Sequence, residues 1–224
     1  MKKIKDYYYR KAKEEKYPAR SVYKLIEIDR KYHILRKGQT ILDVGCAPGS
    51  WSMYMLKKVG NGRVIGIDID SKVHIRDPRF HFINDDILRI NKTALAGELK
   101  GEIQSKELLK EQIQEPSNKV SEEKPRTQFL FDLIVSDAAP KTTGDKFFDS
   151  QQSLIIVKRV FEIATNLLKP GASVVAKVFQ GEDVSEFIRG LKPHFREVHL
   201  FKPKSSRSES KELFIIALQR RNGE

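Results

Sequence analysis

The stretch QTILDVGCAPGSWSMYMLKK, residues 39–58, decides the fold. Residues 40–44 form a short apolar run typical of a buried strand, and a turn with two glycines follows them. The helix expected after this turn presents Met53, Leu56 and Val59 on one face. A strand, a glycine turn and a helix in this order begin the repeating unit of an α/β sheet.

The rest of the chain continues this alternation. We expect further strands at residues 63–70, 80–87, 129–140, 172–179, 197–201 and 212–218, and further helices at residues 18–35, 150–168 and 184–195. The last two strands are joined by a loop of about ten residues, which is too short for a helical crossover, so they should pair antiparallel. The sequence therefore predicts a doubly wound α/β fold, with a mostly parallel seven-stranded sheet and one antiparallel strand near the C-terminus.

Length and composition predict one soluble domain over residues 1–224. The chain has no apolar run of 18 residues, no apolar core of a secretory signal and a single cysteine, Cys46, which together indicate a cytoplasmic protein without a membrane partner. It has no Cys/His cluster, so we expect no metal site. A charged insertion at about residues 91–128 interrupts the alternation, with an exposed helix expected around Leu95, Leu99 and Ile103 and a mobile loop after it.

The formal net charge of +12 favours a polyanionic partner, with nucleic acid first and an anionic membrane second. A basic N-terminal segment, about residues 1–20, and the loop at residues 202–211 are the expected RNA contacts. The cations of the N-terminal segment are Lys2, Lys3, Lys5, Arg10, Lys11, Lys13 and Arg20. The run Tyr7, Tyr8 and Tyr9 either stacks on unpaired bases or packs against the body of the protein.

The loop DVGCAPGSW, residues 43–51, suggests the class of cofactor. It lacks the G-x-G-x-x-G order of a dinucleotide site and the Lys-Ser/Thr of a P-loop, which disfavours a dehydrogenase and a nucleotide triphosphatase. Asp43 and a turn built on Gly45 and Gly49 instead suit a cofactor with a cationic end and no phosphate, such as S-adenosylmethionine.

Acidic residues follow the next two strands at the edge where doubly wound folds bind ligands. Asp68 ends the second strand and is expected to accept hydrogen bonds from ribose hydroxyls. Asp85 and Asp86 end the third strand, where one of them can accept a hydrogen bond from an adenine amino group. Trp51 opens the helix after the loop, and it either covers the cofactor or RNA side or packs between helix and sheet.

The strand VVAKVF, residues 174–179, contains one lysine among apolar residues. A buried lysine needs acidic partners. Asp137 follows the fourth strand, and Glu212 begins the last, antiparallel strand, so both should lie at the same sheet edge as Lys177 and supply those partners.

These segments resemble the FtsJ-like (RrmJ-type) ribosomal RNA ribose 2′-O-methyltransferases. The resemblance rests on DYYYRKAKEEKYPARSVYKL, LDVGCAPGSWS, IGID, VSDAAP, VVAKVF and KPKSSRSESKELF, and covers nearly the whole chain. It implies a Rossmann-like class I methyltransferase fold with S-adenosylmethionine as cofactor. The family's catalytic tetrad maps onto Lys24, Asp137, Lys177 and Glu212, of which Lys24 is implied by the resemblance alone. The family's cofactor contacts map onto Gly49, Trp51, Asp68, Asp86 and Asp137.

The resemblance also implies a reaction, the methylation of the ribose of a uridine in large-subunit (23S-type) ribosomal RNA. It further implies that the enzyme is a monomer that acts on the large ribosomal subunit. Lys177 is then the general base or the group that orients the hydroxyl, steered by Asp137 and Glu212, and Lys24 orients the substrate. Two alternatives stay open: methylation of tRNA anticodon-loop riboses, and a non-catalytic RNA-binding factor in ribosome assembly.

Overall fold

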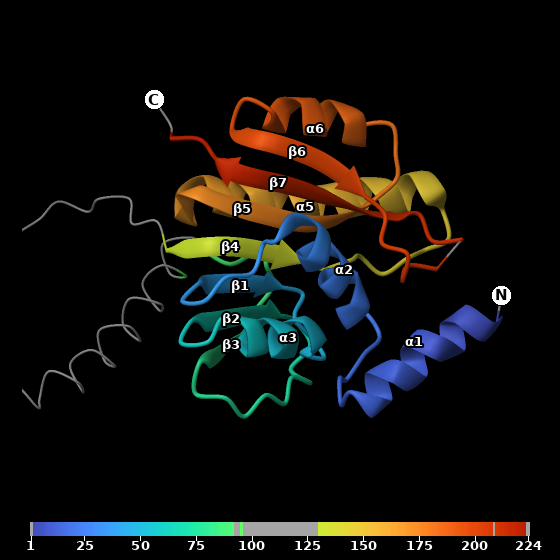
Figure 1. Ribbon diagram of the computed structural model, residues 1–224. Coiled ribbons are helices and arrows are strands. Elements are labelled where there is room, and N and C mark those ends of the chain that lie inside the picture. Colours follow the sequence, from blue (N-terminus) through green and yellow to red (C-terminus); the bar gives the residue numbers. More distant parts are fainter. Residues whose placement is uncertain (1, 92–94, 96–129, 208, 223–224) are drawn as a thin grey trace, which may run out of the picture.

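The computed structural model describes residues 2–91, 95, 130–207 and 209–222. The helices are α1 (Lys2–Glu14), α2 (Val22–Tyr32), α3 (Ser50–Lys58), α5 (Lys146–Leu167) and α6 (Val184–Leu191). The strands are β1 (Thr40–Val44), β2 (Arg63–Asp68), β3 (Phe80–Asn84), β4 (Phe131–Ser136), β5 (Leu168–Phe179), β6 (Phe195–Phe201) and β7 (Glu212–Arg220). Figure 1 shows these strands side by side in one twisted sheet.

The sheet has seven strands in the order β3-β2-β1-β4-β5-β7-β6. The pairs from β3 through β5 are parallel, whereas β7 runs antiparallel to both β5 and β6. The doubly wound, mostly parallel sheet with one reversed strand near the C-terminus is therefore confirmed. The reversal puts the first residue of β7 at the edge where β1, β4 and β5 end.

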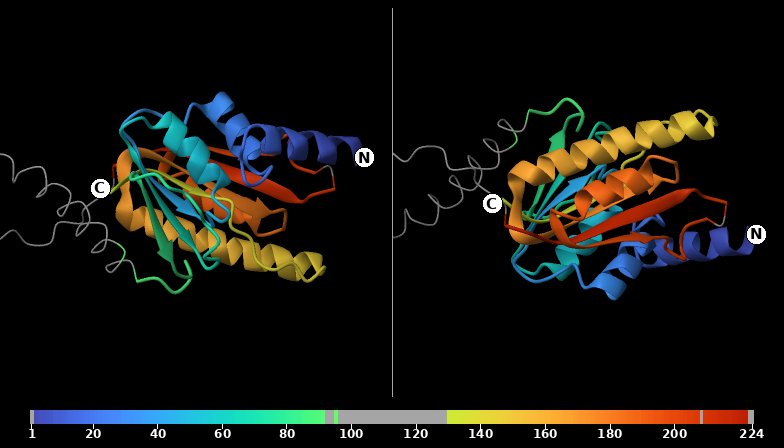
Figure 2. Two further views of the ribbon diagram at one scale, coloured as in Figure 1. Left: turned by 90° about the horizontal axis from the view of Figure 1, so that it is seen from below. Right: turned by 90° about the horizontal axis from the view of Figure 1, so that it is seen from above.

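Helices cover both faces of the sheet, with α2 and α3 on one face and α5 and α6 on the other (Figure 2). Each strand supplies both cores by alternation: Ile134 and Val174 pack with the α5 and α6 side, while Leu133 and Val175 pack with the α2 and α3 side. Because the central strands are buried on both faces, they read as continuous apolar runs in the sequence.

Several element boundaries differ from the sequence-based expectation. Helix α5 begins at Lys146 rather than residue 150, because the Asp145 side chain accepts hydrogen bonds from the backbone N–H groups of Phe147 and Phe148. Helix α2 begins at Val22, four residues after Pro18, where the sequence predicts its first turn. A third difference is that β5 starts immediately after α5, at Leu168, where it pairs with Phe131.

The charged insertion of the sequence analysis lies largely outside the described residues. Leu99, Ile103 and the expected loop are among the residues not described. Leu95, which was expected on an exposed helix, is fully buried in the core beneath α5. Within the described ranges, no helix is long and apolar enough to cross a membrane.

The cap of α5 can be tested because Asp145 lies at the surface. Replacing Asp145 with Ala removes the acceptor for the first free N–H groups of the helix, and we expect the free energy of unfolding to fall by about 1 kcal/mol. Urea denaturation measures this change. The variant Asp145→Asn keeps a side-chain acceptor and serves as control. Equal losses in both variants would show that the cap does not stabilise α5.

Candidate active site

The alternation of strand side chains places Lys177 on the α2 face of the sheet. Val175, two residues earlier in β5, belongs to the core on that face, so Lys177 points the same way. Glu212 begins β7 two residues before Phe214, which packs in the same core. Phe214 pairs directly with Lys177 across the strands, so the carboxylate of Glu212 lies diagonally next to the lysine.

Two lysines and two acids form a continuous chain of ion pairs at this edge. The Lys177 Nζ lies 3.0 Å from Asp137 Oδ1 and also donates a hydrogen bond to the Asp137 carbonyl. Asp137 Oδ1 in turn lies 3.5 Å from Lys24 Nζ, and Lys24 donates a 2.8 Å hydrogen bond to Glu212 Oε2. Each of the four side chains is 9–15% exposed, so the group is nearly desolvated yet reachable from solvent.

The pairing within this group differs from the expectation in one respect. The sequence suggested that both acids hold Lys177, whereas the structure pairs Lys177 with Asp137 and gives Glu212 to Lys24. Lys24 comes from α2, which crosses above the ends of β5 and β7, and its ammonium also lies 5.8 Å from the Phe214 ring. Lys24 therefore links the two acids and keeps the Glu212 carboxylate from being buried without a cation.

A cavity of about 580 Å³ opens beside Asp137. Its walls come from the ends of β1, β2 and β4 and from one face of α5. Four carboxylates line it, those of Asp68, Asp85, Asp86 and Asp137. Gly45 and Ala47 of the glycine turn also line it, whereas Asp43, Gly49 and Trp51 do not belong to its wall.

The matching family model is described as FtsJ-like methyltransferase, and it covers residues 17–220. The chain belongs to the FtsJ-like methyltransferase family. All four residues of the ion-pair chain lie inside the matched range.

Relatives support this membership over nearly the full length. A protein of Oleidesulfovibrio alaskensis named ribosomal RNA large subunit methyltransferase E is 41% identical over 219 residues, covering 97% of this chain and 93% of the relative. A protein of the same name from Desulfotalea psychrophila is 38% identical, covering 99% and 98%. Among solved structures, a ribosomal RNA methyltransferase from Plasmodium falciparum has a TM-score of 0.71 at 27% identity, covering 92% of this chain and all of that one.

The glycine turn of this FtsJ-like methyltransferase is shaped by close backbone contact. Gly45 has φ 75°, and a Cβ added there would lie 2.6 Å from the Cβ of Ala138 and 2.8 Å from its backbone nitrogen. No other residue fits, because both the backbone angle and the space exclude a side chain. The end of β1 is thereby held against the segment that follows β4, which brings the turn close to Asp137.

Asp68 is held in place by the same turn. Its carboxylate accepts hydrogen bonds from the backbone N–H groups of Ala47, at 2.8 Å, and Asp70, at 2.8 Å. Asp86 similarly accepts from the N–H of Leu88 at 2.9 Å, and Asp85 accepts from the N–H of Asp86. Each carboxylate oxygen retains a second lone pair, so these fixed acids can still accept from hydroxyl or amino groups in the cavity.

Trp51 occupies a core position rather than the cavity wall. Its indole is buried, packs 5.8 Å from the Phe214 ring between centroids, and donates a 2.9 Å hydrogen bond to the Ser21 carbonyl. This is the packing alternative of the sequence analysis. The indole thus contacts both the residue before α2, Ser21, and β7, whose Phe214 pairs with Lys177.

Helix α5 was predicted from the sequence, but its place in the wall of the cavity was not. Phe148, Gln152 and Ile156 line it at four-residue spacing, so they share one face of α5. This spacing is visible in the sequence. It was missed because the helix was expected to begin at residue 150, which left Phe148 outside it.

The basic segments expected to contact RNA lie next to the ion-pair chain. In α1, Tyr8 packs 5.2 Å from the Tyr23 ring, which is the packing alternative for that residue, whereas Tyr7 and Tyr9 are exposed and their stacking on bases stays a prediction. Arg20 donates a 2.7 Å hydrogen bond to the carbonyl of Ser205 in the loop at residues 202–211, which joins that loop to the N-terminal segment. The side chains of Lys2, Lys3 and Lys5 lie outside what the structure describes.

Asp43 is a buried acid beneath the cavity. It accepts a 2.6 Å hydrogen bond from the Ser52 hydroxyl, and its second oxygen has no hydrogen-bond partner in the described part of the chain. Burial raises the pKa of Asp43 to about 7; the nearby carboxylates of Asp137 and Asp68 add to this rise, and the hydrogen bond from Ser52 opposes it.

The raised pKa of Asp43 predicts a pH dependence of stability. In the unfolded chain this carboxyl titrates near pH 4, so from about pH 4 to 7 the folded protein keeps a proton that the unfolded chain has released. The free energy of unfolding should therefore fall as pH rises through this window, by up to about 4 kcal/mol. Asp43→Asn removes the titration, so its Tm relative to wild type should rise between pH 4.5 and 8 in thermal melts without cofactor.

A matched control for this measurement is Glu186→Gln, which changes an exposed carboxyl on α6. Its Tm should follow that of the wild type at every pH. If the Tm of Asp43→Asn also runs parallel to the wild-type curve, burial of Asp43 does not raise its pKa as stated.

Proposed function

We propose that the protein transfers a methyl group from S-adenosylmethionine to a ribose 2′-hydroxyl, that of a uridine in large-subunit ribosomal RNA. The observation that carries this proposal is the ion-pair chain Lys177–Asp137–Lys24–Glu212 at the mouth of an acid-lined cavity. The names of the relatives support ribosomal RNA of the large subunit as the substrate.

The cavity suits this cofactor by its chemistry. Its four carboxylates accept hydrogen bonds, which matches ribose hydroxyls and an adenine amino group, and they favour a cationic ligand over one that carries phosphates. Asp68 is placed to hold the ribose, and Asp85 or Asp86 the adenine. When bound, S-adenosylmethionine supplies an electrophilic methyl group and a positive charge.

Lys177 is the group that receives or directs the hydroxyl proton. It can act as a base only when neutral, since the ammonium form has no lone pair. Two lysines and two acids sum to zero charge, and a cationic cofactor raises the total to +1. Loss of one proton from Lys177 then restores neutrality, while Asp137 keeps Lys24 as a partner.

The RNA approaches over α1 and the loop at residues 202–211, which flank the ion-pair chain. Backbone N–H groups of Lys204 and Ser205 donate to the carboxylate of Glu27 at 2.7 and 2.8 Å, so the loop is held against α2, the helix that carries Lys24. Exposed Tyr7 and Tyr9 are available for stacking on unpaired bases. The cytoplasmic location and monomeric state expected from the sequence remain predictions.

The substrate assignment is tested by methyl transfer to three RNAs. We expect transfer to undermodified large ribosomal subunits, at one ribose that can be mapped, and much less to bare ribosomal RNA or to tRNA. Transfer to tRNA alone would instead support an anticodon-loop enzyme. Failure to bind S-adenosylmethionine would support the non-catalytic assembly factor.

The role of Lys177 is tested by Lys177→Ala. This variant leaves Asp137 paired with Lys24, so it should fold and bind S-adenosylmethionine as tightly as wild type in calorimetry. Methyl transfer under single-turnover conditions should fall by a factor on the order of 10² or more. The exposed Lys158 on α5 offers a control, Lys158→Ala, which should keep full activity. Near-wild-type transfer by Lys177→Ala would rule out the assigned role.

A further inference from the structure

A second cavity, of about 390 Å³, lies at the amino ends of the parallel strands, opposite the ends that carry the ion-pair chain. Its walls are the segment after α2, the residues at the starts of β1 and β4, the turn within β5 and the end of β7. The parallel strands begin here and end at the active site, so the two cavities are separated by the length of the sheet. The proposed methyl transfer has no use for this second cavity.

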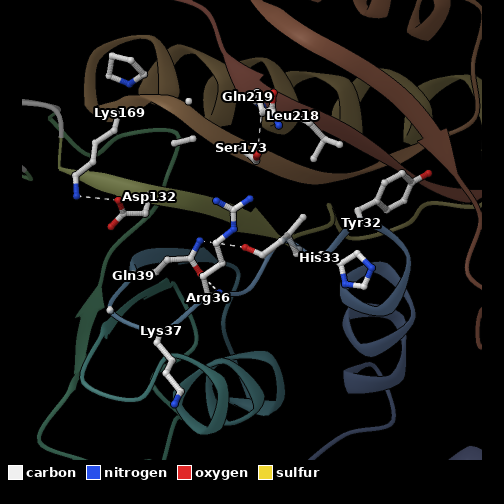
Figure 3. A pocket seen from close by; sticks show the side chains of 15 residues that line it. Tyr32, His33, Arg36, Lys37, Gln39, Asp132, Lys169, Ser173, Leu218 and Gln219 are labelled. Carbon is white, nitrogen blue, oxygen red and sulfur yellow. Dashed lines mark hydrogen bonds and ion pairs between the residues drawn. The ribbon is translucent and has the colours of Figure 1, made fainter.

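An arginine side chain extends into this cavity. Figure 3 shows the Arg36 guanidinium directed into the middle of the lining, whereas the neighbouring Lys37 points away. The backbone N–H of Arg36 donates to the Gln39 side chain, and Gln39 donates to the Ile34 carbonyl at 3.0 Å, which fixes the loop that carries the arginine. Within the part of the chain that the structure describes, the Arg36 side chain has no hydrogen bond or ion pair.

The negative charge that lines the cavity is already neutralised. Asp132 accepts a 2.9 Å hydrogen bond from Lys169 and a 2.8 Å hydrogen bond from the backbone N–H of Thr40. Lys169 and Asp132 together contribute no net charge, so Arg36 leaves the cavity positive. The Ser173 hydroxyl accepts from the N–H of Gln219 at 3.3 Å and is free to donate its own proton.

The backbone of the wall is strained at two positions. His33 has φ 51° and Gln219 has φ 55°, and both line the cavity. Non-glycine residues in the left-handed region are uncommon and cost free energy, and they cluster at binding sites. Of the three such residues in the described ranges, the third is Lys16, two residues after the end of α1.

We propose that this cavity binds a phosphate group, and that the RNA backbone supplies it at a point remote from the methylated ribose. A guanidinium offers paired planar donors that match phosphate oxygens, and the Ser173 hydroxyl of the same cavity adds a further donor. A cation past a helix end can also serve only to stabilise the helix dipole. Arg36, however, lies four residues beyond the end of α2 and points into the cavity instead of toward the helix end.

RNA fits this site better than an acidic peptide. The formal net charge of +12 favours a polyanionic partner, and a ribosomal RNA substrate is large enough to contact both ends of the sheet. The proposal rests on the RNA substrate of the proposed function. It does not depend on methyl transfer.

The test measures RNA binding without cofactor, as a function of salt. The probe is a large-subunit ribosomal RNA fragment, and the variants are Arg36→Gln and the matched control Lys158→Gln, which removes an exposed cation from α5. We expect Arg36→Gln to weaken binding about 3- to 5-fold and to reduce the slope of log K against log salt by about 1. Lys158→Gln should change neither, and both variants should have wild-type Tm, since both side chains are exposed.

Equal salt slopes for wild type and Arg36→Gln would overturn RNA as the source of the phosphate. Titration with inorganic phosphate, followed by NMR at Ser173 and Gln219, then decides whether the cavity binds phosphate at all. Shifts that vanish in Arg36→Gln would support a site for free phosphate, whereas no shift in either protein would overturn the phosphate site. Shifts caused by a polyglutamate peptide alone would overturn it in favour of an acidic peptide. If the wild-type protein transfers no methyl group but Arg36→Gln still weakens RNA binding and reduces the salt slope, the result counts against the proposed function only.

Discussion

The buried ion pair between Lys177 and Asp137 is the constraint on which the active site depends. A lysine at a nearly buried strand position destabilises the fold unless a carboxylate neutralises it. Asp137 meets that need only because β4 and β5 are parallel neighbours that end at the same edge. The same carboxylate then contacts Lys24 and lines the cavity, so one acid joins Lys177 of β5, the rest of the ion-pair chain and the proposed cofactor site.

The reversed strand β7 completes this arrangement. Had the last strand run parallel, Glu212 would begin it at the far edge, near the second cavity, and Lys24 would lack its 2.8 Å partner. Alternation along β5 and β7 then selects the α2 face for both Lys177 and Glu212. Strand direction and strand period together decide which four charges meet.

The two ends of the sheet have different chemistry for a reason that follows from topology. Acids follow the carboxyl ends of the strands, where the proposed cation-bearing cofactor would bind, whereas Arg36 and Lys169 lie at the amino ends. A single sheet can thereby present an acid-lined cavity for a small cofactor and a positive cavity for a polyanion without mutual interference. The separation by the length of the strands limits the electrostatic coupling between them.

The sequence by itself determined the order of elements, the antiparallel end of the sheet and the edge at which Asp68, Asp137, Lys177 and Glu212 gather. These follow from the spacing of apolar residues and from loop length, both of which are properties of short stretches of the sequence. Which acid pairs with which lysine, the core position of Trp51 and the wall formed by Phe148 were decided only in the tertiary structure. They depend on how α2 and α5 cross the sheet, and a helix crossing is set by packing between residues that lie from 30 to 188 positions apart in the sequence.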